Sequence, residues 1–104
     1  MIEIMITHDR IAARGHATDT QGCAAVNAIL YALAGGLENL SDPVRWHIES
    51  GCAEIPIPDS ADAQAMRLMA EIGLRQLADV REDIYILETV FTDETWERPQ
   101  EAKK

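Results

Sequence analysis

The sequence predicts an α+β fold, a single mixed sheet packed with two helices, and three observations lead to it. Short segments with alternating apolar residues occur in neighbouring pairs, starting with IEIMI at residues 2–6. Two segments of about twenty residues instead repeat their apolar residues at helical spacing. The resulting order, β-β-α-β-β-α-β, favours one sheet with both helices packed on it. A chain of 104 residues fits one such domain, which we place at residues 1–91.

The first half of the chain predicts a hairpin followed by a long helix. Residues 2–6 form the first strand, residues 8–10 a tight turn, and residues 11–16 a second, weaker strand. A polar loop at 17–22 leads into a helix at about 21–40. The residues expected on its buried face are Cys23, Val26, Ile29, Leu30, Leu33 and Leu37.

The second half predicts another hairpin, another helix and a last strand. Strands are expected at 44–49 and 52–57, around a turn at Ser50-Gly51, and at 84–91. Between them, residues 61–80 have helical spacing, capped by Asp59 or Ser60. The apolar face expected for this helix comprises Ala65, Met66, Met69, Ile72, Leu74, Leu77 and Val80. Residues 92–104 are polar and form a predicted tail.

Composition and charge exclude several classes of function. A formal net charge of −9 argues against direct binding of nucleic acid and favours a basic peptide or protein as partner. No apolar run approaches about 18 residues, so we expect no contact with a membrane. Two cysteines do not form a disulfide framework, which makes a reducing cytoplasm the expected location. Nothing in the sequence calls for a metal or an organic cofactor.

The stretch RGHATDTQGCAAVNAIL contains the candidate catalytic pair, His16 and Cys23. Cys23 falls in the first turn of the predicted helix, where free N–H groups and the helix dipole favour a thiolate. His16 ends a strand, and six intervening residues are long enough to bring its imidazole to the sulfur. The N–H groups of Gly22, Cys23 and Ala24 are candidate donors for an oxyanion. Asp19 either orients the imidazole or caps the helix.

Gly15-His16-Ala17 followed by Cys23-Ala24-Ala25-Val26 resembles the signature of the ribosomal-processing cysteine protease (Prp) family. The segments MIEIMI, GLENL and MAEIGLRQLADVREDIYI follow in the family's order, so the resemblance covers about residues 1–91. It implies that Cys23 is the nucleophile of a cysteine endopeptidase and His16 its base. It also implies a homodimer that removes an N-terminal extension from a large-subunit ribosomal protein, or processes a phage structural protein.

The sequence departs from that family beside the catalytic pair. The loop between His16 and Cys23 is only ATDTQG, whereas the family's is usually longer and acts as a mobile lid. Gln21-Gly22 replace two aliphatic residues before the cysteine, and Asn27 stands where a serine is common. These changes affect the lid and the wall beside it, while both members of the pair are kept.

Two other interpretations compete with a protease. One is a non-catalytic, dimeric protein-binding module on the same fold, which the shortened loop favours. The other is a metal site, because His8, His16, His47, Cys23 and Cys52 are all possible ligands. None of these residues has the close spacing of a structural zinc site.

Overall fold

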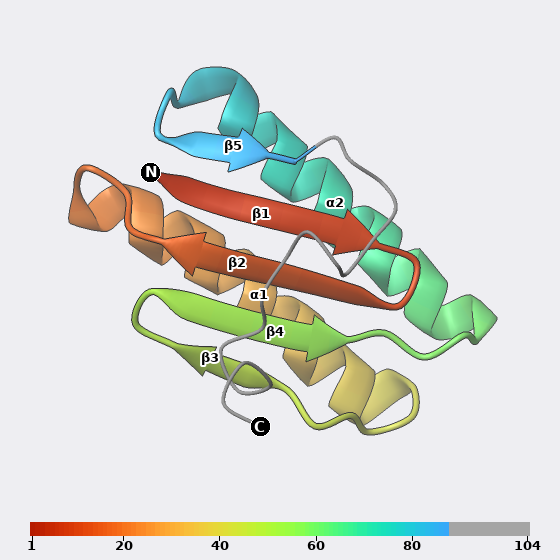
Figure 1. The fold of residues 1–104 in the computed structure, drawn as a ribbon. Helices are drawn as coiled ribbons and strands as arrows, with labels where there is room; N and C mark the ends of the chain where they lie inside the picture. The colour runs from red at the N-terminus through yellow and green to blue at the C-terminus, as the bar shows by residue number, and fades with distance from the viewer. Residues whose placement is uncertain (88–104) are drawn as a thin grey trace.

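Five strands and two helices make up the computed structural model, which describes residues 1–87 (Figure 1). Their order is the one expected from the sequence. The elements are β1 (Ile2–Thr7), β2 (Arg10–Gly15), α1 (Thr20–Leu40), β3 (His47–Glu49), β4 (Cys52–Pro56), α2 (Ala61–Val80) and β5 (Ile84–Ile86).

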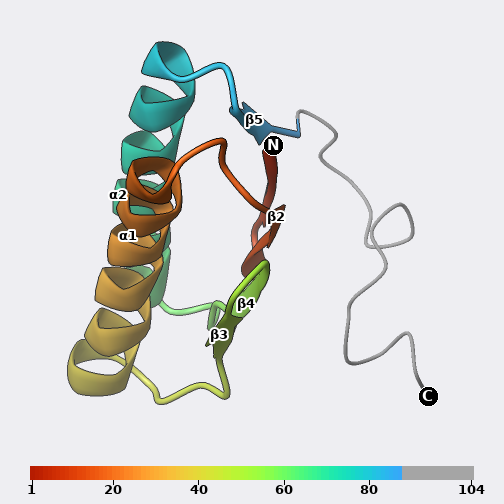
Figure 2. The same cartoon turned by 90° about the vertical axis from the view of Figure 1, so that its left-hand side faces the viewer.

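The strands form one mixed sheet in the order β3-β4-β2-β1-β5. β1 pairs antiparallel with β2 and parallel with β5, while β4 pairs antiparallel with both β2 and β3. Both helices cover the same face of the sheet, as the view along its edge shows (Figure 2). The α+β fold with one mixed sheet and two helices is therefore confirmed.

The hydrophobic core lies between the sheet and the helices. Helix α1 contributes a continuous buried stripe, which follows from the helical spacing of its large apolar residues. Strand residues that point toward the helices alternate with outward-facing ones and complete the core. The largest buried apolar side chains are Ile4, Ile11, Leu30, Leu37, Ile55 and Leu74.

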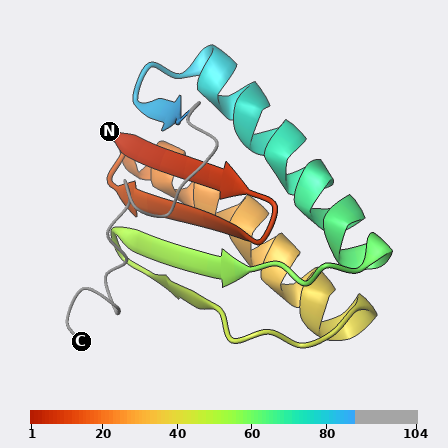
Figure 3. The same ribbon diagram turned by 45° about the vertical axis from the view of Figure 1, so that its right-hand side comes forward.

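Helix α2 buries only part of the face that was expected: Leu74 is buried and Met66 and Leu77 pack against the core. Ala63, Ala70 and Leu74 are its buried residues, whereas Met69 is 75% exposed and Val80 is 78% exposed. The two helices run side by side (Figure 3). A Cβ at Gly36 of α1 would lie 2.8 Å from the Met66 sulfur. The helices thus meet closely through small residues, and several apolar residues of α2, including Met69 and Ile72, face solvent.

Two strands are shorter than predicted. The strand expected at 44–49 is β3 and begins only at His47, although Val44 and Trp46 still pack against the core. The last strand ends at Ile86, and the Leu87 N–H then donates to the Ile4 carbonyl at 2.8 Å. Residues 88–91 of that strand and the predicted tail at 92–104 lie outside the described residues.

Helix α1 is more apolar than expected from the absence of a long uninterrupted apolar run in the sequence. By length and composition alone it would pass as a membrane-spanning helix, with a mean hydropathy of 1.3. Core helices pass the same test, and Val26, Leu30, Leu33 and Leu37 of α1 are buried in the core. That no membrane is involved stays a prediction.

Candidate active site

Cys23 is held at the beginning of α1 by a capped helix terminus. The Asp19 carboxylate accepts the Gly22 N–H at 2.9 Å, which makes Asp19 the N-cap residue. Of the two roles considered for Asp19, the structure shows capping. Cys23 itself is half-buried, and its Sγ accepts the Ala17 N–H at 3.4 Å. This N–H and the positive end of the helix dipole both favour a negatively charged sulfur.

His16 follows the last residue of β2 and its imidazole lies against the turn between β3 and β4. A Cβ at Gly51 would come within 2.8 Å of His16 Nε2, so only glycine leaves room for the ring. Gly51 also has a φ of +81°, which other residues rarely adopt. The Gly15 N–H donates to the Gly51 carbonyl at 3.0 Å, which joins the end of β2 to this turn.

His16 and Cys23 line the same cavity, of about 240 Å³, between α1 and the β3–β4 hairpin. Asn27 and Tyr31, one and two turns after Cys23, extend its wall along α1. The Tyr31 ring packs edge-on against Trp46, with the ring centroids 6.0 Å apart. The cavity is smaller than the roughly 300–1,000 Å³ of typical ligand pockets, so it suits a short part of a peptide.

A thiol and an imidazole in one cavity can perform nucleophilic catalysis when the imidazole takes the thiol proton. Within residues 1–87, no hydrogen bond joins the His16 ring to the Cys23 sulfur. Catalytic hydrogen bonds are often long or misaligned before substrate binds, so this arrangement does not exclude a working pair.

The loop between His16 and Cys23 is tied to the beginning of β5. Asp83 accepts both the Thr18 N–H, at 2.8 Å, and the Thr18 hydroxyl, at 2.9 Å. Arg81 bridges Asp83 and the capping carboxylate of Asp19, at 2.9 and 2.8 Å. Its guanidinium, together with the Thr18 N–H, holds the pKa of Asp83 well below its usual range. Asp83 in turn raises the pKa of Arg81. The short loop is therefore fastened to the body of the protein.

Gly22 and Ala24, two of the predicted oxyanion donors, do not line the cavity that contains His16 and Cys23. Among the described residues that line the cavity, Gly22, Ala24 and Asp19 are absent. The Gly22 N–H is already engaged by Asp19, and Ala24 is the fifth residue of α1, where N–H groups bond within the helix. Gly22 is buried and leaves room for the Arg81 side chain, because a Cβ at position 22 would lie 2.9 Å from Arg81 Nη2. Stabilisation of an oxyanion by the N–H groups of Gly22, Cys23 and Ala24 therefore stays a prediction.

Sequence reasoning missed most of the residues that surround the pair. The sequence marks Asn27 as a departure from the family, but Tyr31 was missed and could have been found, because it lies eight positions after Cys23 on the same helix face. Gly51, Arg81 and Asp83 gave no such signal, since they reach the site only through pairing of distant segments.

The remaining candidate ligands are spread over the molecule. His8 lies in the turn between β1 and β2, and its Nε2 is 2.9 Å from the carboxylate of Asp59, which precedes α2. The structure does bring His47 and Cys52 together, with Glu49, on the β3–β4 hairpin.

Comparison with known proteins finds this fold in solved structures. A scan against protein-family models and a search of curated proteins find no match. The ribosomal processing protease Prp from S. aureus, solved with a covalently linked product peptide, superposes with a TM-score of 0.74. It is 19% identical and is matched over 83% of this chain and 97% of its own. SMU.848 from Streptococcus mutans has a TM-score of 0.70 at 21% identity, over 84% of this chain and 94% of its own. The chain thus has the fold of the ribosomal processing protease Prp, as the sequence resemblance implied.

Proposed function

We propose that this protein is a cysteine endopeptidase in which Cys23 is the nucleophile and His16 the general base. Cys23 Sγ attacks the carbonyl carbon of a peptide bond while its proton passes to the imidazole. His16 then returns this proton to the departing amine, which leaves the acyl group on Cys23 as a thioester. Water, deprotonated by His16, hydrolyses the thioester and restores the thiol.

The observation that carries this proposal is the placement of His16 and Cys23 in one cavity. They come from the end of β2 and the beginning of α1, and the Ala17 N–H directed at the sulfur supports a thiolate there. The likeness to Prp supports the same class of reaction.

A peptide is the proposed substrate. Prp from S. aureus has been solved with a substrate peptide and with a covalently linked product peptide. The net charge of −9 favours a basic segment, such as an N-terminal extension of a ribosomal or phage structural protein.

The pH dependence of Cys23 alkylation tests the catalytic pair before a substrate is known. Iodoacetamide labelling, followed by peptide mass spectrometry, is run on the metal-free wild type and on His16→Ala, with Cys52 as internal control. We expect Cys23 to react at lower pH than Cys52 and the difference to vanish in His16→Ala. Equal behaviour of the two cysteines in the wild type would contradict the proposal. A library of basic peptides, with Cys23→Ser as inactive control, then tests cleavage itself.

A non-catalytic peptide-binding module is the second candidate, and the fastened loop favours it. Thr18, Asp83 and Arg81 hold the loop where a mobile lid would have to move. This alternative predicts that peptides bind the wild type and Cys23→Ser with the same affinity and are released uncut. Isothermal calorimetry followed by mass spectrometry of the peptide separates the two functions.

We further propose that the protein is a homodimer in a reducing cytoplasm. Leu68, Met69 and Ile72 of α2 are exposed, and Met69 lies beside an apolar cavity between the two helices. Exposed apolar surface of this kind is typical of interfaces. Sedimentation equilibrium should give twice the mass of the chain for the wild type and a monomer for Met69→Glu. A monomeric wild type would contradict the proposed dimer.

A further inference from the structure

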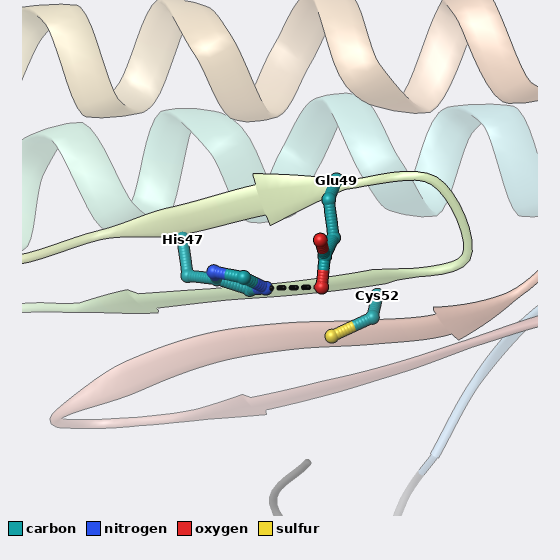
Figure 4. Close-up of side chains that lie close together, drawn as sticks. All are labelled: His47, Glu49 and Cys52. Atoms are coloured by element: carbon teal, nitrogen blue, oxygen red, sulfur yellow. Dashed lines mark hydrogen bonds and ion pairs between the residues drawn. The ribbon is translucent and has the colours of Figure 1, made fainter. Parts of the chain in front are cut away.

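The β3–β4 hairpin carries three side chains with metal-ligating atoms beside one another (Figure 4). The His47 nitrogen, a Glu49 carboxylate oxygen and the Cys52 sulfur all lie within 4.8 Å of one another. His47 Nε2 and Glu49 Oε2 are already 2.8 Å apart. Ile48 and Ala53, which alternate with these residues, pack in the core, so the three face away from the helices.

We propose that His47, Glu49 and Cys52 form a zinc-binding site with one open coordination position. Imidazole, carboxylate and thiolate are all zinc ligands, and zinc is bound in proteins by three protein ligands when a water or another small ligand takes the fourth position. In a tetrahedral site the ligand atoms lie about 3.4–3.6 Å apart, given the usual bond lengths. Small rotations of side chains bring the cluster to these separations.

The register of the hairpin explains why these three residues meet. Glu49 is directly opposite Cys52 in the β3–β4 pairing, and His47 lies two residues before Glu49 on the same face. The turn at Gly51, with its φ of +81°, fixes this register. The ligands therefore sit on a rigid hairpin and not on a loop, which reduces the cost of ordering them around an ion.

Among residues 1–87, two ion pairs flank the cluster on this face of the sheet. Glu54 is opposite His47 and forms an ion pair with Arg10. Arg14 is opposite Cys52 and pairs with Glu3 at 2.8 Å. Binding of zinc displaces the Cys52 thiol proton to solvent and replaces the hydrogen bond between His47 and Glu49 with bonds to the metal.

The proposed zinc site is separate from His16 and Cys23 but shares a structural support with them. Glu49 and Cys52 also line the wall of the cavity, and Gly51 between them lies against the His16 imidazole. Zinc would therefore stiffen the turn on which His16 rests. The site itself does not depend on the protein being a protease.

Zinc titration of the reduced, chelator-treated protein against a chromogenic chelator tests the site, with cobalt as a spectroscopic substitute. We expect one zinc ion per chain and a thiolate-to-cobalt charge-transfer band. Cys52→Ser and His47→Gln should each weaken zinc binding by more than tenfold, and Cys52→Ser should remove the band. Circular dichroism checks that both variants are folded. If Cys52→Ser does not fold, His47→Gln still tests the site, because His47 is only half-buried and its substitution leaves no large cavity.

Matched controls come from the other cysteine and another exposed histidine. Cys23→Ser and His8→Gln should bind zinc and cobalt as the wild type does. Loss of binding in Cys23→Ser with retention in Cys52→Ser would place the metal at the His16–Cys23 cavity and overturn the proposal. Absence of stoichiometric zinc binding at micromolar concentrations would overturn it as well.

Discussion

Replacing Gly51 by alanine should destabilise the protein and displace the His16 imidazole at the same time. A residue with a Cβ at φ +81° costs about 1–2 kcal/mol. The new Cβ would lie 2.8 Å from His16 Nε2 and 3.2 Å from Cε1, so the ring must leave its position. Since His16 is exposed, it can swing away at a cost of about 0.5–1.5 kcal/mol in side-chain strain. We therefore expect Gly51→Ala to lower the free energy of unfolding by about 1.5–3.5 kcal/mol.

Urea denaturation of four proteins separates the two contributions: wild type, Gly51→Ala, His16→Ala and the double variant. Without the imidazole, Gly51→Ala should cost only the backbone part, about 1–2 kcal/mol. The cycle is thus non-additive, and alkylation of Cys23 in Gly51→Ala should resemble that in His16→Ala. If Gly51→Ala costs the same in both backgrounds, His16 does not rest on this turn and the geometry argued above is wrong.

Gly35→Ala is the matched control for a glycine without such constraints. It lies in the interior of α1, and a Cβ there meets nothing within 4 Å. The substitution should stabilise the protein by about 0.5–1 kcal/mol and leave Cys23 alkylation unchanged.

Three further substitutions test the loop, the cap and the core. Asp83→Asn should reduce the loss of stability in acid. The pKa of Asp83 is lower in the folded than in the unfolded protein, so the ionised carboxylate stabilises the fold. This stabilisation is complete above the ordinary pKa of 3.8 and is lost as the pH falls below that value. Urea melts between pH 6 and about pH 2 measure this, and parallel curves for variant and wild type would refute the role of Asp83. Asp19→Ala should cost about 1 kcal/mol and Asp19→Ser much less, because serine also caps helices; equal losses in thermal melts would show that the cap is unimportant. Leu74→Ala should cost about 2–5 kcal/mol, because Leu74 is fully buried, against less than about 1 kcal/mol for exposed Leu40→Ala at the end of α1.

The sequence was sufficient to predict the order of the elements because their periodicities differ clearly. Ile2 and Ile4 of β1 and the apolar residues of α1 are large and regularly spaced. They are buried in the core, as the sequence predicted. The buried face of α2 was predicted correctly only at Met66, Leu74 and Leu77, for a physical reason. Ala63 and Ala70 form most of it, and small residues contribute little to an apolar pattern, whereas Met69 is strongly apolar but exposed.

In the candidate site, too, the features formed by residues close in sequence could be predicted, and the contacts between distant segments could not. Cys23 at a helix beginning and Asp19 as its cap are local features, and both could be predicted. The contacts of Gly51 with His16 and of Asp83 with Thr18 depend on which strands pair in the sheet, and no local pattern marks them. The clustering of His47 with Cys52 likewise needed the register of a hairpin whose first strand has only three residues.

The fastening of the loop to β5 has a consequence for a chain that is still being synthesised. Thr18 and Asp83 are 65 positions apart, and proteins leave the ribosome from their N-terminus. The thiol of Cys23 therefore emerges well before the residue that anchors the loop in front of it. A nascent or truncated chain that stops before Asp83 carries Cys23 without the contacts that fix the neighbouring loop. The loop between His16 and Cys23 can therefore take its final position only after Asp83 has been synthesised.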